Sequence, residues 1–201
     1  MTIDEYLRNT AQPKLQLGCG GNFLQGWLNT DITLYSQEAV YLDLTQPFPI
    51  ADSSFDRVFS EHAIEHIPYI SGLHMLQESF RVLKPGGRIR ISCPDFQFLI
   101  DMYTKPTELS EEYIRATNPS WAPFPSAIFT INNFVRDWGH QFIYDKPTLA
   151  TSLLAAGFVD VTEHLVLESN DAAFKNLEVV NRMNPGFLQL ESMTLEATKP
   201  L

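Results

Sequence analysis

The sequence predicts an α/β fold with a doubly wound, mainly parallel sheet of about seven strands and helices on both faces. Three observations lead to this prediction. From Lys14 onward, short apolar runs alternate with stretches of helical spacing, and glycine and proline clusters separate them. Of the 201 residues, 44% are hydrophobic, enough for the core of a single domain over residues 1–201. Strands that alternate with helices pair in parallel through right-handed crossovers.

The first half of the chain is expected to hold five strands and one long helix. Residues 1–13 are expected to form an N-terminal helix or arm. Apolar side chains at helical spacing predict a helix over residues 64–83. The Lys-Pro-Gly-Gly of residues 84–87 is expected to end that helix, because proline cannot continue it and glycines favour a turn. The predicted strands are residues 14–17, 27–32, 39–42, 55–60 and 88–93.

Residues 96–137 interrupt this alternation directly after the fifth predicted strand. The segment holds four prolines and several aromatic side chains, so we expect an inserted lid over a binding pocket. The alternation resumes with a predicted helix over residues 147–156. Two late strands are expected at residues 158–167 and 188–198, joined by a polar connection.

Charge and composition argue against several classes of protein. The chain has 14 Lys and Arg residues against 24 Asp and Glu residues, a formal net charge of -10, so it lacks the basic surface that bulk nucleic acid or an anionic membrane requires. Its apolar runs are far shorter than the roughly 20 residues that span a bilayer. Residues 1–13 carry charges where a signal peptide needs an apolar segment. Cys19 and Cys93 give neither a disulfide framework nor metal-ligand spacing. We therefore expect a cytoplasmic protein without a membrane span.

A glycine-rich turn follows the first predicted strand. Gly18 and Gly20 allow the chain to turn sharply and a ligand to approach the backbone closely. A dinucleotide-binding turn would need a third glycine at position 23, which is Phe23, and the P-loop pattern is absent. The turn therefore argues against a nucleotide-linked oxidoreductase, which stays open only as an alternative.

Polar side chains follow the next strands. Asp31 ends the second strand, where its carboxylate can accept hydrogen bonds from both hydroxyls of a ribose, and Asp43 ends the third, where it can meet an adenine edge. Ser60 ends the fourth strand. Ligands of doubly wound sheets bind beyond the carboxyl ends of the strands, so these side chains and Gly18 are expected at one site.

The order of these motifs resembles the class I S-adenosylmethionine-dependent methyltransferases, which have a Rossmann-like fold. The resemblance is carried by L-G-C-G at residues 17–20, F-D-R-V at residues 55–58 and R-V-L-K-P-G-G at residues 81–87. It extends over about residues 14–94 and 140–158. The G-W-L-N-T-D of residues 26–31 is similar to a methyltransferase type 11-like subgroup with a shortened first helix.

The resemblance implies S-adenosylmethionine as the cofactor, with its methionine part at the L-G-C-G turn. Two positions depart from the family's pattern: Gln16 stands where an acidic residue is usual, and Asn22 stands at the usual third glycine. These departures keep open a module that binds the cofactor without catalysis. The residues assigned to cofactor binding are Gly18, Cys19, Gly20, Asp31, Ile32, Asp43, Leu44 and Ser60.

Residues 60–66 hold a cluster of histidine and glutamate. His62, Glu65 and His66 form H-x-x-E-H, a pattern also found in metallopeptidases, but Pro68 restricts the preceding residue and cuts short a helix that starts in the motif. The segment is also similar to the E-x-x-E-H of metal-assisted quinone-type O-methyltransferases, with His62 in place of the first glutamate. We expect no metal here and interpret Glu65 and His66 as side chains that hold the start of the helix.

Methyl transfer to a hydroxyl or amine needs alignment, exclusion of water and a base. His62 and His140 are the candidate catalytic residues, the latter because G-H-Q-F-I-Y at residues 139–144 resembles a family segment that faces the pocket. The resemblance implies a methyl acceptor, which we expect to be a small molecule or glycan-like, because the aromatic side chains of residues 96–137 suit a planar ring or a sugar face. The same aromatic side chains also suit a hydrophobic cap or a homodimer contact.

Overall fold

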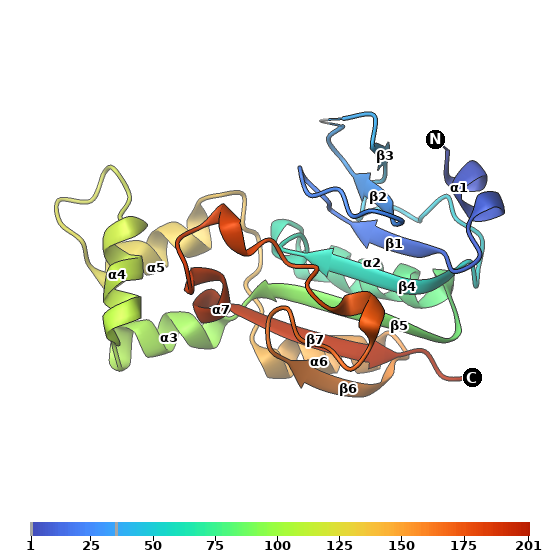
Figure 1. The fold of residues 1–201 in the computed structure, drawn as a ribbon. Helices are drawn as coiled ribbons and strands as arrows, with labels where there is room; N and C mark the ends of the chain where they lie inside the picture. The colour runs from blue at the N-terminus through green and yellow to red at the C-terminus, as the bar shows by residue number, and fades with distance from the viewer. Residues whose placement is uncertain (1, 35) are drawn as a thin grey trace.

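A computed structural model describes residues 2–34 and 36–201. Its centre is a seven-stranded sheet with the strand order β3-β2-β1-β4-β5-β7-β6 (Figure 1). Neighbouring strands are parallel except for β7, which runs antiparallel to β5 and β6. The predicted doubly wound, mainly parallel sheet is confirmed. Its strands are β1 (Lys14–Leu17), β2 (Leu28–Asp31), β3 (Ala39–Tyr41), β4 (Phe55–Glu61), β5 (Leu83–Pro94), β6 (Val159–His164) and β7 (Ser192–Thr198).

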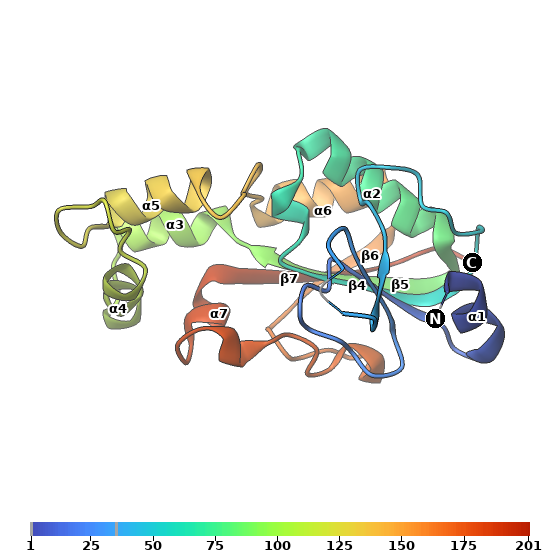
Figure 2. The ribbon, with the colours of Figure 1, turned by 90° about the horizontal axis from the view of Figure 1, so that it is seen from above.

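One face of the sheet is apolar and lies under two helices, α2 (Tyr69–Val82) and α6 (Lys146–Ala155) (Figure 2). Successive side chains of a strand point to opposite faces, so Ile89 and Ile91 of β5 enter this layer together. They share one fully buried core cluster with Leu76 of α2 and Leu153 of α6. This layer is the main hydrophobic core of the domain.

The opposite face carries charged side chains and a small apolar cluster of Trp27, Phe59 and Phe174. It is covered by residues 165–186, which contain the short 3₁₀ helices η2 (Ala172–Phe174) and η3 (Val180–Arg182) (Figure 2). Fully buried Arg90 of β5 pairs through its guanidinium with Glu178 of this cover and with Glu196 of β7, each at 2.7 Å. We call the charged set that joins cover and sheet the ion-pair layer; its members are Arg57, Arg88, Arg90, Asp171, Glu178 and Glu196.

Residues 2–13 contain helix α1 (Ile3–Asn9), which agrees with the predicted N-terminal helix; Met1 lies outside the described residues. Thr2 and Glu5 form a reciprocal capping box at its start. The buried ring of Tyr6 stacks on Phe55, so the helix is anchored to the core.

The segment 96–137 forms three helices, α3 (Phe96–Thr104), α4 (Glu108–Ala116) and α5 (Ala127–Arg136), which extend beyond the carboxyl ends of the parallel strands (Figure 1). We call this segment the helical insertion. It packs on helix α7 (Phe187–Glu191) and has an apolar cluster of its own. The buried members of that cluster are Phe98, Leu99, Met102, Tyr113, Ile114, Phe134 and Phe187.

Most predicted boundaries differ from the structure by one or two residues, and three differ in kind. The helix predicted over residues 64–83 divides into the 3₁₀ helix η1 (Ile64–His66) and α2, because Ile67 is extended before Pro68. Residues 84–87, predicted as a turn, belong to β5 and contain Gly86 at φ +75°. The first four residues of the strand predicted over 188–198 are helical and belong to α7.

Candidate functional site

Two neighbouring strands of the sheet, β1 and β4, have their connections on opposite sides, and ligands of open α/β sheets bind at such a switch point. Gly18 follows β1 there, and His62 follows β4. Three cavities open around these two residues, and His62 lines all three. We call them cavities I, II and III.

Cavity I, of about 540 Å³, lies beyond the ends of the first three strands. Its lining includes six of the eight residues that the sequence assigns to cofactor binding: Gly18, Gly20, Asp31, Ile32, Asp43 and Leu44. Gly18 has φ +65°, and a Cβ there would lie 2.5 Å from the Cβ of Ala63, so the turn requires glycine. Gly20 also has positive φ but faces open space, which leaves room for a ligand against the backbone.

The two aspartates shape the edge of cavity I. Asp31 accepts hydrogen bonds from the backbone N–H groups of Gly20 and Thr33, both at 2.8 Å. Asp43 accepts hydrogen bonds from the backbone N–H of Thr45 at 2.9 Å and from its hydroxyl at 2.7 Å. A carboxylate has about four lone-pair sites, so each aspartate keeps acceptor capacity for a ligand hydroxyl or amine.

The other two predicted residues lie elsewhere. Cys19 lines cavity II rather than cavity I, and burial raises the pKa of its thiol to about 11, which keeps it protonated at neutral pH. Ser60 is buried within β4 and is not part of the lining of the cavities described here. The strand continues one residue further than predicted, to Glu61, so Glu61 and His62 rather than Ser60 reach the edge.

Cavity II, of about 360 Å³, lies on the other side of the glycine turn. It is lined by Gln16, Glu61 and Arg182, and Oε1 of Glu61 lies 3.6 Å from the guanidinium of Arg182. Oε1 of Glu61 also accepts the backbone N–H of Val179 at 3.0 Å. Val179 and Arg182 were missed in the sequence, because residues 168–187 read only as a polar connection. Glu61 was missed because the fourth strand was predicted to end at Ser60.

Cavity III, of about 450 Å³, lies between β4, the helical insertion and α7. Its aromatic lining includes Tyr113, Phe134 and Trp138, and its charged lining includes two buried carboxylates, Glu65 and Glu191. The hydroxyl of Tyr113 donates to Oε2 of Glu191 at 2.5 Å. Side chains of the insertion thus line cavity III, whereas Trp121 and Phe129 line a separate surface hollow with Ile128.

His62 has a strained backbone, with φ +47° at the end of β4. Its Nε2 lies 2.8 Å from the hydroxyl of Ser192, and its Nδ1 lies 3.3 Å from Oε1 of Glu65. Because His62 precedes η1 and has a left-handed backbone, it does not share a helical face with His66. The arrangement that the metallopeptidase alternative requires is therefore absent from this described segment.

Glu65 is fully buried at the floor of cavity III. Burial raises the pKa of its carboxyl, but the neighbouring His62 and His66 outweigh this and hold the pKa below its ordinary value. The carboxylate is thus ionised. Within the described chain neither of its oxygens accepts a well-aligned hydrogen bond.

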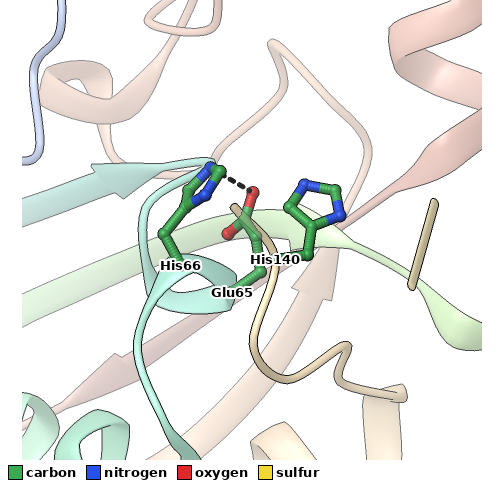
Figure 3. A group of neighbouring side chains, drawn as sticks. All are labelled: Glu65, His66 and His140. Carbon is green, nitrogen blue, oxygen red and sulfur yellow. Dashed lines mark ion pairs between the residues drawn. The ribbon is translucent and has the colours of Figure 1, made fainter. Parts of the chain in front are cut away.

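His140 lies in the loop after α5 and faces Glu65 and His66 (Figure 3). Its Nδ1 lies 2.6 Å from the carbonyl oxygen of Phe134, to which it donates, so Nε2 carries the lone pair. Burial lowers the pKa of this imidazole, which keeps it neutral at neutral pH. Both predicted catalytic histidines therefore line cavity III.

Comparison with known proteins identifies a matching family and similar structures. Residues 15–91, which include the glycine turn, both aspartates and the β4 segment, match the family model described as "Methyltransferase domain". The chain has the Rossmann-like fold of the class I methyltransferases. Over 135 residues it is 33% identical to a demethylmenaquinone methyltransferase of Clavibacter sepedonicus, which covers 63% of this chain but only 48% of that protein. The chain thus spans about half the length of this curated relative.

Solved structures share the fold of this chain at low sequence identity. A SAM-dependent methyltransferase from Archaeoglobus fulgidus superposes with a TM-score of 0.57 at 17% identity, over 98% of this chain and 89% of that one. Phosphoethanolamine N-methyltransferase 2 of Haemonchus contortus, in complex with S-adenosyl-L-methionine, gives 0.56 at 14% identity, over 96% of this chain and 49% of that one. In the part of our chain that the structure describes, every helix is too short or too polar to cross a membrane.

Proposed function

We propose that this protein is an S-adenosylmethionine-dependent methyltransferase that acts on a small-molecule or glycan-like acceptor. One observation carries the proposal: cavities I and III meet at His62 and His66, which line both. A cofactor in cavity I and an acceptor in cavity III would therefore face each other across these side chains. The free, buried thiols of Cys19 and Cys93 agree with the expected cytoplasmic location.

The adenosine part of the cofactor fits cavity I. Asp31 and Asp43 stand at the ends of β2 and β3 with acceptor capacity for the ribose hydroxyls and the adenine amine. Gly20 leaves the space that the ligand would occupy. Ile32 and Leu44 add apolar surface for the faces of the base.

The methionine part fits cavity II. The carboxylate of Glu61 and the amide oxygen of Gln16 suit the ligand ammonium, and the guanidinium of Arg182 suits its carboxylate. Oε1 of Gln16 is buried and lacks a hydrogen-bond partner among the described residues, as expected for a group that awaits a ligand. Glu61 would supply the negative charge that the family usually has at position 16.

The bound cofactor supplies a methyl group already activated on a sulfonium, so the chain's own task is to align the acceptor, exclude water and take up its proton. Tyr113, Phe134 and Trp138 form an aromatic wall that suits a ring or a sugar face. His140 is neutral and presents Nε2 to the cavity, so it is our first candidate for the base. His62 is the second, although both its nitrogens already have partners.

The first test measures binding of S-adenosylhomocysteine by calorimetry and by thermal unfolding. At one hundred times the dissociation constant, binding adds about 2.7 kcal/mol to the free energy of unfolding. That gain raises the melting temperature by roughly 5–10 °C in a domain of this size. Asp31→Ala should weaken binding by roughly 10- to 100-fold, because hydrogen bonds to a charged acceptor are each worth about 1.5–3 kcal/mol. The proposal is wrong if millimolar ligand neither binds nor shifts the melting temperature.

The second test identifies the acceptor. Cofactor with a labelled methyl group is incubated with the protein and fractionated cell metabolites, and the fraction that gains label is analysed. His140→Ala should then lower turnover far more than it lowers S-adenosylhomocysteine affinity. Binding without labelling of any fraction would favour the alternative raised by Gln16 and Asn22, a module that binds the cofactor without catalysis.

A further inference from the structure

Three side chains in cavity III place potential metal ligands close together. Glu65 and His66 come from η1, and His140 comes from the loop after α5 (Figure 3). One donor atom from each lies within 4.8 Å of the others. The H-x-x-E-H motif alone does not predict these three ligands. Its first histidine, His62, is not among them, and the third ligand is His140, which is distant in the sequence.

The carboxylate of Glu65 lacks the partners that a buried anion needs. Its side chain is 1% exposed, and the nearest described ring nitrogen, Nδ1 of His62, lies 3.3 Å from Oε1. Neither η1 nor α2 has a side-chain cap, so the expectation that Glu65 holds the start of the helix is not met. A buried carboxylate is costly unless it is paired or coordinates a metal.

The two histidines have the features of metal ligands. His140 donates through Nδ1 to the carbonyl of Phe134, the outer contact that fixes the tautomer and orientation of many metal-bound histidines. Figure 3 shows the rings of His66 and His140 on either side of the Glu65 carboxylate. The His66 side chain is 40% exposed, so it has room to turn and shorten the donor separations to those around an ion.

We propose that Glu65, His66 and His140 bind a divalent first-row transition-metal ion in cavity III. Two imidazoles and one carboxylate suit such ions and leave coordination positions open toward the cavity. If the proposed methyltransferase function also holds, an acceptor hydroxyl in an open position would lose its proton more readily. Nε2 of His140 would then hold the ion, and His62 would be the remaining candidate for the base. The metal site itself does not depend on that function.

The test uses the full chain, stripped with a chelator and titrated with zinc chloride in a calorimeter. Cobalt(II) serves as a second probe, because its visible absorption reports coordination. We expect one ion per chain in both titrations. Loss of an outer-shell partner typically weakens metal binding 10- to 100-fold, so Glu65→Gln and His140→Ala, which remove direct ligands, should weaken it at least about 100-fold. His74→Asn on α2, outside the set, is the matched control and should bind like the wild type.

Circular dichroism and the unfolding midpoint of each variant establish that it is folded. Should a ligand variant fail to fold, His66→Ala, which removes a half-exposed side chain, takes its place. The inference is overturned if the stripped protein binds neither ion stoichiometrically, or if the ligand variants bind as tightly as His74→Asn. Titration with S-adenosylhomocysteine in the same samples separates the two proposals, since either ligand can bind without the other.

Discussion

Cavities I and III lie side by side, yet the chain builds them differently. Nearly all the lining of cavity I comes from residues 18–67, where turns follow successive strands, and Gln141 is its one distant member within the described chain. Cavity III takes its lining from residues 62–66, from Pro94, from the helical insertion with the loop behind it, and from residues 182–191. Cavity I is therefore formed by local backbone geometry. Cavity III, in contrast, forms only when the helical insertion packs on α7.

Because the two cavities are built differently, we expect different substitutions to affect each of them. Cavity I depends on glycine conformations and on backbone hydrogen bonds to Asp31 and Asp43. Cavity III depends on packing between separate helices and on one buried hydrogen bond, from Tyr113 to Glu191. Changes to the turn should therefore reduce cofactor affinity, and changes to the docking should reduce acceptor turnover alone.

The largest effect is expected for Gly18→Ala. The new Cβ would meet Ala63 at 2.5 Å, and an L-residue at φ +65° is strained. We expect a loss of about 2–4 kcal/mol in the free energy of unfolding and at least about a tenfold loss of S-adenosylhomocysteine affinity. Chemical denaturation and calorimetry measure the two quantities. Gly26→Ala is the control, because φ there is +77° but no described atom lies within 4 Å of the Cβ. If Gly18→Ala and Gly26→Ala lose the same stability and the same ligand affinity, the contact between residue 18 and Ala63 is not the cause of the effect.

A smaller and more selective effect is expected for Tyr113→Phe. Removal of the hydroxyl leaves buried Glu191 without this donor, at a cost of about 1.5–3 kcal/mol for a hydrogen bond to a charged group. Acceptor turnover should fall by about tenfold or more, and S-adenosylhomocysteine affinity should stay within about twofold. Tyr103→Phe, on the exposed surface of α3, should change neither quantity. A parallel loss of cofactor affinity would show that the cavities are not independent.

Within the helical insertion, two aromatic side chains should behave differently. Phe134 lines cavity III, so Phe134→Leu should lower turnover through lost packing of about 1 kcal/mol. Trp121 is exposed and lines a hollow elsewhere, so Trp121→Ala should leave turnover and cofactor affinity unchanged. Steady-state kinetics and sedimentation of both variants provide the measurement. A dimer that dissociates only in Trp121→Ala would support the homodimer contact expected from the sequence.

The smallest effect concerns acid stability of the cover over the charged face. Burial raises the pKa of Asp171, but the backbone N–H of Ala173 and the guanidinium of Arg57 outweigh it and hold the pKa below its ordinary value. A lowered pKa in the folded state stabilises the protein above the unfolded-state pKa, and that contribution is lost as pH falls through the folded-state value. Asp171→Asn should therefore be less stable at neutral pH and should lose less stability than wild type between about pH 5 and about pH 2.

Urea unfolding at several pH values measures this difference. Asp101→Asn, on the half-exposed surface of α3, serves as the control and should follow the wild-type curve. Identical pH dependence in wild type and Asp171→Asn would mean that this ion pair contributes nothing to acid stability.

The sequence was sufficient for the parts of the molecule that local geometry determines. The glycine turn and both aspartates follow from alternation, glycine chemistry and strand order, and the structure gathers them in cavity I. The position of Ser60 could not be obtained in this way. Strand β4 extends one residue beyond Ser60, and successive side chains of a strand point to opposite faces, so Glu61 rather than Ser60 lies at the carboxyl end of the strand.

Tertiary packing decides the rest. Arg182 and Glu61 come together only because residues 165–186 fold back over the sheet, and nothing in a polar connection signals that path. His140 was found through its resemblance to a family segment, but its neighbours Glu65 and Phe134 depend on how the insertion returns to the sheet. The helical content of residues 96–137 was hidden by prolines, which lie between the helices rather than within them.

The ion-pair layer also affects how readily residues 165–186 open locally. To lift residues 165–186 from the sheet, the chain would have to break the ion pair of Glu178 with Arg90 and those of Asp171 with Arg57 and Arg88. The fully buried Arg90 would then keep one carboxylate partner, Glu196, in place of two. Local opening of this cover should therefore require nearly as much free energy as global unfolding. Its hydrogen-bonded amides should exchange with deuterium almost as slowly as those of β5, although the cover consists mainly of irregular backbone. Residues 165–186 would then belong to the part of the protein most protected from amide exchange. Arg182, which lies within them, would be held at a fixed position in cavity II.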